Sequence, residues 1–229
     1  MKKVFLAIVL AASSFVASAQ TQTKFGIKGG VNFANVHLST EGSSTSANAG
    51  NLTSFSAGLF ADVQVSEGFS IQPALLYSGK GFKISQTATA TFESVNVNAE
   101  SKLKTKLNYI QVPVNFLYNS RTNAGNFFIG GGPFAAVAVS AHYKGYVYGS
   151  GTDGQNTVEQ REDMDEKIEI GKDSGIKRMD YGITGLAGFR FNNNLSLNVN
   201  YDLGLANINN GDDTKMKTRV IGVSIGYSF

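Results

Sequence analysis

The sequence contains no cysteine and no tryptophan, and it has only three prolines in 229 residues. Without cysteine the chain has no disulfide bridges, no thiol nucleophile and no lipid-bearing N-terminal cysteine. The absence of tryptophan weakens a lipocalin interpretation. Glycine (26 residues), phenylalanine (16) and tyrosine (9) are abundant instead. This composition is typical of tightly curved sheets that carry girdles of aromatic side chains.

The sequence also lacks an apolar run of the ~20 residues that a membrane-spanning helix needs. Its N-terminus has a shorter run, residues 4–16, which follows Lys2 and Lys3 and precedes Ala17-Ser18-Ala19. A basic start, a short apolar core and a small-residue cleavage site predict a secretory signal peptide over residues 1–19. A buried N-terminal helix is the weaker alternative. We therefore expect residues 20–229 to form the mature domain.

The mature chain has almost no net charge. The full sequence has 20 basic and 17 acidic residues, and removal of Lys2 and Lys3 leaves 18 against 17, a net charge of +1. A chain this close to neutrality offers no basic surface that favours nucleic acid. We therefore expect no nucleic-acid partner.

Near the end of the chain two kinds of residue alternate, with Val220 as the exception. One face of the closing strand is mostly apolar, and the other is mostly small or polar. This two-residue period is the pattern of a transmembrane β-strand, whose apolar face contacts lipid. The outward residues are Arg219, Ile221, Val223, Ile225, Tyr227 and Phe229, and the inward ones are Thr218, Gly222, Ser224, Gly226 and Ser228.

Seven earlier segments alternate in the same way, and each is long enough to cross a bilayer as a tilted strand, which takes ~9–11 residues. The connections between the eight strands are alternately short and long. Outer-membrane barrels show this asymmetry, with tight periplasmic turns and long extracellular loops. The strands are 24–35, 54–65, 69–83, 106–118, 127–143, 180–191, 195–208 and the closing strand; the short connections are 66–68, 119–126 and 192–194, and the long ones 36–53, 84–105, 144–179 and 209–216.

The sequence therefore predicts an all-β fold: an eight-stranded antiparallel up-and-down transmembrane β-barrel. A sheet in lipid must close because its unpaired edge groups would each cost several kcal/mol. An even strand number places both termini on the periplasmic side. Eight strands leave an interior that side chains can fill. The inward charges should then pair with one another, Lys28 with Asp62 in particular; the inward set is Lys28, Asp62, Lys80, Arg190 and Asp202.

Two of the long connections carry further patterns. Within residues 84–105, Thr87, Thr89 and Thr91 alternate with apolar residues. This alternation predicts a hairpin that continues the flanking strands beyond the membrane. The connection 144–179 is long and locally acidic, and we interpret it as a solvated loop. Asp163-Met164-Asp165 begins like a calcium loop, but the ligand and glycine positions that follow are not filled. We therefore predict no metal site.

Several motifs together are similar to those of a known family. They are 26–32 (GIKGGVN), 107–114 (LNYIQVPV), 181–188, 201–208 (YDLGLANI) and 225–229 (IGYSF). They resemble the PorT-like outer-membrane β-barrel proteins of Bacteroidetes, sometimes labelled porin family, along the whole mature chain. The resemblance implies a bacterial outer-membrane location and lipid contact. The resemblance extends to Tyr227 and Phe229, which are similar to the C-terminal signal by which the barrel-assembly machinery recognises its clients.

The residues that carry chemistry are few. His37 and His142 fall where strands would meet the outer surface, near Ser39 and Ser140, without a spacing that links them. The two rim histidines leave a catalytic alternative open, an enzyme of the acyltransferase or protease kind at the rim of the barrel. Such an enzyme also needs a carboxylate near the histidine and, for acyl transfer, a serine. Gly130-Gly131-Gly132 lacks the helix and lysine of a phosphate-binding loop, so close strand packing explains it better. We predict no enzyme activity and no cofactor.

Three functions follow as hypotheses. The first is a structural and interaction scaffold with a filled lumen, in which 84–105 and 144–179 bind an envelope or extracellular protein. The second is a narrow porin-like channel for small solutes, which the family label favours and the strand number opposes. The third is the rim enzyme.

Overall fold

The computed structural model describes residues 23–40, 46–92, 95–152, 156–171, 175–211 and 214–229. The predicted signal peptide, residues 1–19, lies outside the described residues. Within them the chain forms one antiparallel sheet of ten strands. The strands are β1 (Thr23–Thr40), β2 (Ser46–Asn48), β3 (Leu52–Ser66), β4 (Phe69–Phe92), β5 (Val95–Thr122), β6 (Gly125–Thr152), β7 (Thr157–Lys167), β8 (Met179–Phe191), β9 (Leu195–Gly204) and β10 (Thr214–Ser228).

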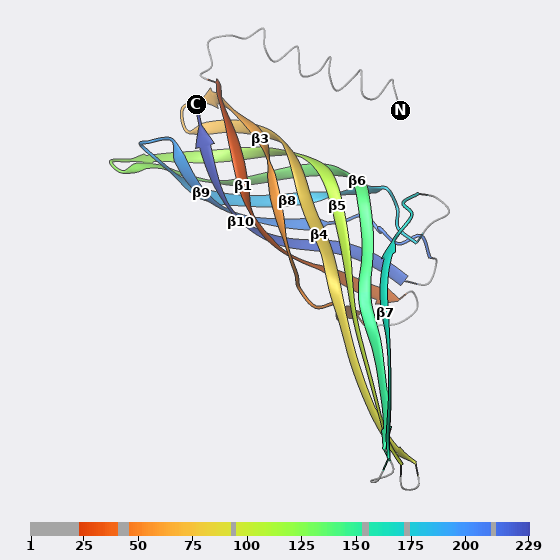
Figure 1. The fold of residues 1–229 in the computed structure, drawn as a ribbon. Coiled ribbons are helices and arrows are strands. Elements are labelled where there is room, and N and C mark those ends of the chain that lie inside the picture. Colours follow the sequence, from red (N-terminus) through yellow and green to blue (C-terminus); the bar gives the residue numbers. More distant parts are fainter. Residues whose placement is uncertain (1–22, 41–45, 93–94, 153–155, 172–174, 212–213) are drawn as a thin grey trace.

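The sheet closes on itself (Figure 1). Nine strands follow one another in the order β10-β9-β8-β6-β5-β4-β3-β1-β2, β7 pairs with β6 beside this path, and β1 also pairs with β10. The predicted count of eight strands is therefore too low for the sheet. The two additional strands, β2 and β7, lie in segments predicted as long loops. The prediction missed them because it searched for membrane-crossing strands with one apolar face.

The outside of the barrel is apolar. Large side chains that alternate along the strands are exposed, whereas the glycine and serine residues between them are buried. On β10, for example, Ile221, Val223 and Ile225 point outward between Gly222 and Ser224. An apolar outer surface is stable only in lipid. The pattern predicted for the closing strand is thus confirmed.

One end of the barrel holds the tight connections, and we call it the turn end. Strands β3 and β4 are joined there through Glu67 and Gly68, and β8 and β9 through residues 192–194. Gly68 and Asn194 have positive φ values of 82° and 66°, a conformation that suits tight turns. The C-terminus also lies at this end, because the Phe229 N–H donates a hydrogen bond to the Phe25 carbonyl over 2.9 Å.

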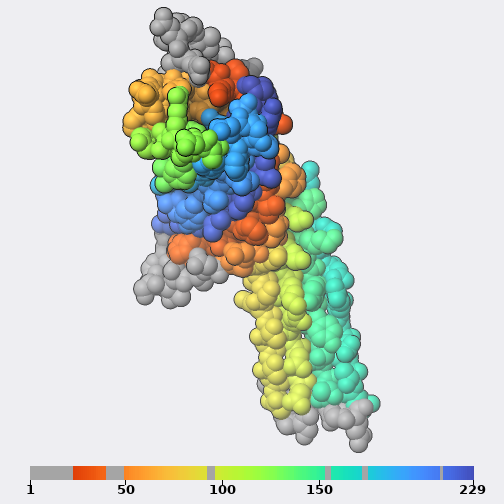
Figure 2. Space-filling view, turned by 90° about the vertical axis from the view of Figure 1, so that its left-hand side faces the viewer, coloured from red at the N-terminus to blue at the C-terminus, as the bar shows by residue number. Residues whose placement is uncertain are grey.

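Four strands run far beyond the other end, and we call this part the projecting sheet (Figures 1 and 2). It consists of residues 83–92 of β4, 95–105 of β5, 143–152 of β6, and β7. The predicted hairpin over 84–105 is confirmed, since β4 and β5 pair as far as Phe92 and Val95. The prediction of a solvated loop over 144–179 is wrong for much of this range, because two strands occupy it. Strand β6 continues to Thr152, and β7 pairs back against it.

No helix among the described ranges has the length and apolar character needed to span a membrane.

Candidate functional site

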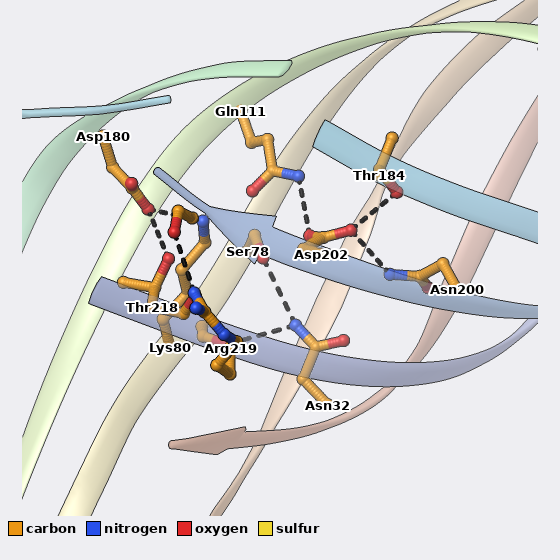
Figure 3. Close-up of polar contacts among 12 residues, drawn as sticks. Asn32, Ser78, Lys80, Gln111, Asp180, Thr184, Asn200, Asp202, Thr218 and Arg219 are labelled. Carbon is orange, nitrogen blue, oxygen red and sulfur yellow. Dashed lines mark hydrogen bonds and ion pairs between the residues drawn. The ribbon is translucent and has the colours of Figure 1, made fainter. Parts of the chain in front are cut away.

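The barrel interior contains a buried ion pair near the projecting end. Lys80 Nζ lies 2.8 Å from Asp180 Oδ2, and neither side chain is accessible to solvent. The Thr218 hydroxyl donates to the same carboxylate oxygen over 2.9 Å (Figure 3). The Lys80 ammonium also lies over the rings of Tyr109 and Phe134, at 5.1 and 4.5 Å from their centroids. Strands β4, β8 and β10 are thereby linked through the lumen.

A second polar group lies around Asp202. Its two carboxylate oxygens accept hydrogen bonds from the side chains of Gln111 (2.9 Å), Thr184 (2.7 Å) and Asn200 (3.0 Å) (Figure 3). Lys28 and Asp202 line the same cavity of about 20 Å³. That volume holds about one water molecule. The interior is therefore filled by side chains at this level.

The predicted pairing of Lys28 with Asp62 is wrong. Strands β1 and β3 place Lys28 opposite Gly58, and Asp62 opposite Lys24. Asp62 instead forms an ion pair with Arg190 from β8, across the lumen at the turn end. The sequence prediction assumed a hairpin register that starts at the wrong residue, which moved Asp62 four positions along the strand.

The turn end opens into a polar cavity of about 580 Å³. The Asp62–Arg190 pair, Lys24, Glu67 and Arg121 contribute its charges. Leu117, Phe128 and Leu186 form a buried apolar cluster in the lumen. Two polar pairs and several apolar clusters thus fill the lumen between the two ends.

The projecting end of the lumen is closed by an apolar cluster. Ile176 and Ile208 come from the connections that follow β7 and β9, and they pack against strand residues on the inner wall. Ile168 and Ile170 lie against the same cluster. The strand members of the cluster are Val36, Phe82, Leu107, Tyr109, Phe134, Ala136, Ala138 and Ala141.

The two faces of the projecting sheet differ. Its outer face continues the lipid-facing side of β5 and carries charged pairs such as Lys144–Asp165 (2.8 Å) and Arg161–Asp163 (2.9 Å). Arg161 also lies 4.2 Å from the centroid of the Tyr146 ring. The hydrogen bond from Lys144 lowers the pKa of the Asp165 carboxyl and raises the pKa of Lys144. The Arg161 guanidinium likewise lowers the pKa of Asp163.

The inner face of the projecting sheet continues the lumen wall and is largely small and apolar. Val97, Val147 and Val158 are 36%, 43% and 72% exposed on it. Alanine and glycine residues lie among the valines: Ala88, Ala90, Ala99, Gly145, Gly149 and Gly151. The outer face of the sheet is therefore charged, whereas the inner face is mostly small and apolar on β4, β5 and β6 and carries Gln160, Glu162 and Glu166 on β7.

The structure places the remaining sequence candidates as follows. His37 lies opposite Lys217, and His142 lies opposite Lys106 and Lys167. Asp163 and Asp165, the start of the calcium-like motif, lie on β7 and bind Arg161 and Lys144. Among the described residues no group of three or more His, Cys, Asp and Glu side chains is placed to hold a metal ion.

The glycine run of β6 is a place of close strand approach. A Cβ atom at Gly130 would meet the Phe116 carbonyl oxygen, and one at Gly132 would meet that of Val114. A Cβ at Gly131 would meet the Thr184 carbonyl on the other neighbouring strand. Close packing of β6 between β5 and β8 therefore accounts for the run, as predicted.

The sequence prediction missed Asp180, the partner of Lys80. Its signal was present, because Asp180 precedes the outward Tyr181 and so alternates onto the inner face. The prediction also did not identify Gln111 as a partner of Asp202. The two-residue period predicts which face of the sheet each residue occupies. It does not predict which residues of distant strands lie at the same height in the barrel.

Comparison with solved structures finds outer-membrane barrels at low similarity. Ail, the attachment invasion locus protein of Yersinia pestis, is 11% identical over 91% of this chain and 99% of its own, with a TM-score of 0.34. OprG from Pseudomonas aeruginosa is 14% identical over 91% and 97%, with a TM-score of 0.41. Neisserial surface protein A is 13% identical over 91% and 99%, with a TM-score of 0.36. These likenesses are too low to carry an argument about function.

A search of the curated proteins gives no match to this chain. The comparison with family models does give one. The model described as "Outer membrane protein beta-barrel domain" matches residues 18–210. This range contains most of the strands described above, including the whole projecting sheet. The chain therefore belongs to the outer membrane protein beta-barrel domain family, and its place is the bacterial outer membrane.

Proposed function

We propose that this protein is a closed outer-membrane barrel whose projecting sheet is a docking platform for an envelope or extracellular protein. The observation that carries this proposal is the two-faced projecting sheet. Its inner face leaves Val97, Val147 and Val158 exposed to water. Val97 and Val158 lie in one row with Gly151 between them, and a contiguous exposed apolar patch typically marks an interaction site. Strands β4, β5 and β6 run without interruption from the packed barrel into the sheet, so the sheet is a direct extension of the barrel wall.

The proposal includes finer assignments. The eight long strands span the membrane, whereas β2 and β7 lie outside it. Both termini are periplasmic, which places the projecting sheet outside the cell. The signal peptide of residues 1–19 directs export, and Tyr227 and Phe229 serve as the assembly signal for the barrel-assembly machinery. The PorT-like family is the narrower assignment that the sequence motifs support, and the protein is not an enzyme.

A photo-cross-linking experiment tests the docking proposal. We expect a photoreactive residue at Val97 or Val158 to form a discrete protein adduct in intact cells, because both lie on the inner face of the sheet. The same residue at Glu67, in a turn at the other end, should not form that adduct. The adducts are resolved by electrophoresis and identified by mass spectrometry. Equal adducts at all three positions, or none at the sheet positions, would contradict the proposal.

A shortened variant provides the matching loss of function. Gln86, Ser101, Val147 and Glu162 form one row across the four strands. Replacing 87–100 and 148–161 each by an Asn-Gly turn keeps this row and removes the sheet beyond it. Heat-modifiable migration on gels should persist, whereas the partner identified at Val97 should no longer co-purify with the shortened chain. Undiminished co-purification would place the partner elsewhere.

The filled lumen gives a prediction about conductance. Buried ion pairs and apolar clusters occupy the interior, so the protein in a planar bilayer should show no steady current above the membrane background. Heat-modifiable migration checks that the same preparation is folded. A large and steady current would support the alternative function, a narrow channel for small solutes.

A further inference from the structure

Two rows of basic residues lie on the outer face of the strands where the projecting sheet leaves the barrel. In the first row Lys83 lies opposite Lys104, and Lys104 lies opposite Lys144. In the second row Lys106, His142 and Lys167 lie opposite one another. The rows are two residues apart on the strands, so all six side chains share one face. We call these six residues the basic belt.

The basic belt borders the lipid-facing surface of the barrel. On β5, Lys104 and Lys106 have the same facing as Ile110, Val112 and Phe116, which are exposed on the outside of the barrel. Lys106 precedes Ile110 by four residues, about 13 Å at ~3.3 Å per residue along the strand. The belt therefore lies where the apolar band ends and the polar headgroup layer begins.

The residues that the structure describes neutralise little of this charge. Like charges directly opposite each other on neighbouring strands destabilise a sheet. Along the first row, the structure gives Lys144 the carboxylate of Asp165 as an ion-pair partner. Among the described residues, no carboxylate forms an ion pair with the other four lysines of the belt, which lie on β4, β5 and β7: Lys83, Lys104, Lys106 and Lys167. Three strands carrying such a cluster at one height indicate an external anion.

The opposite rim of the barrel has a different chemistry. At the turn end the outward side chains include Phe69, Tyr118, Phe127 and Phe229, all exposed. Phe69 and Tyr118 form an edge-to-face pair with centroids 5.3 Å apart. Lys24, Arg121 and Arg190 at that end line the internal cavity instead. Basic residues thus border the lipid on the projecting side, and aromatic ones on the turn side.

We propose that the basic belt binds the phosphate headgroups of anionic lipids in the membrane leaflet around the projecting sheet. Each lysine near a negatively charged membrane surface adds favourable attraction, and the attraction is confined to about one Debye length. A row of lysines on an extended strand pair also matches a layer of phosphates better than it matches a single soluble anion. The belt then fixes the height and tilt of the barrel and keeps the projecting sheet clear of the bilayer.

Lipid selection by the full-length protein tests this proposal. The protein is reconstituted in phosphatidylcholine bilayers that contain a trace of spin-labelled phosphatidic acid or spin-labelled phosphatidylcholine. Electron paramagnetic resonance then measures the fraction of each lipid that is immobilised at the protein. We expect phosphatidic acid to be preferred by about five-fold or more, the factor that the attraction of about one lysine provides. The preference should fall towards unity in ~1 M salt.

Two variants with the same change in net charge locate the effect. In the belt variant Lys83, Lys104, Lys106 and Lys144 are each replaced by Gln, and the preference should fall to about two-fold or less. In the control variant Lys24, Lys102, Arg121 and Arg161 are each replaced by Gln, and the preference should remain. Heat-modifiable migration verifies that both variants are folded.

Each outcome of the lipid-selection experiment either supports or overturns the proposal. A wild-type protein without preference for phosphatidic acid overturns the proposal whether or not the variants fold. An equal fall in both variants also overturns it, because net charge and not the belt would then select the lipid. Loss in the belt variant alone supports it. None of these results depends on whether the inner face of the sheet binds a protein.

Discussion

Replacement of Asp180 by Ala is expected to lower the free energy of unfolding by about 3–5 kcal/mol. The substitution leaves the Lys80 ammonium without its carboxylate in a site that solvent does not reach. The Thr218 hydroxyl loses its acceptor as well. The change is measured by urea unfolding of the protein in lipid bilayers, followed by circular dichroism.

The reciprocal and double substitutions separate the charge from the packing. Lys80→Met should be destabilising to a similar degree, because it leaves the buried Asp180 side chain without its cationic partner. The double variant Lys80→Met/Asp180→Leu should recover most of the loss, since apolar residues of similar volume can replace a buried ion pair. Lys144→Ala, which breaks an exposed pair in the projecting sheet, should change the midpoint little. An Asp180→Ala midpoint equal to that of wild type would show that the lumen charge is not the stabilising partner.

A charge on the lipid-facing side of the barrel gives the second large effect. Val223→Arg is expected to lower the free energy of unfolding by about 2–4 kcal/mol in bilayers. Val223 points outward and lies opposite Val31 and Val199 on its two neighbouring strands. Ile221 and Ile225 flank it on the same face, so the guanidinium would enter the apolar band.

The matched control lies on the same sheet but outside the band. Val158 on β7 is 72% exposed, and we expect Val158→Arg to change the unfolding midpoint little because water surrounds it. Both variants are unfolded with urea from the same bilayers. Equal effects at the two positions would contradict the assignment of the outer barrel surface to lipid.

Much of the barrel could be predicted from the sequence. The two-residue period assigned outward and inward faces on β10, and the short connections located the turns, because both signals are local along the chain. The alternation of Thr87, Thr89 and Thr91 likewise revealed the hairpin of β4 and β5 beyond the membrane. All of these patterns act within one strand or between two consecutive strands.

The interior pairs and the edge of the projecting sheet were not predictable in the same way. The partner of Lys80 lies 100 residues away, and the partner of Asp62 lies 128 residues away. Their heights depend on the register of several strand pairs, and one error in β1–β3 moved Asp62 away from its true partner. Strand β7 was missed because most of its residues are polar and exposed, so no continuous apolar face marks it.

The pairing of the first and last long strands has a consequence for assembly. Ile27 lies opposite Tyr227, which follows it by 200 residues. Closing a loop of that length has a large entropic cost, and contacts between distant residues slow folding. A nascent chain that lacks β10 would expose the hydrogen-bonding edge of β1 to hydrocarbon. The cylinder is therefore expected to become stable in a single late step, after the C-terminal segment has crossed into the periplasm.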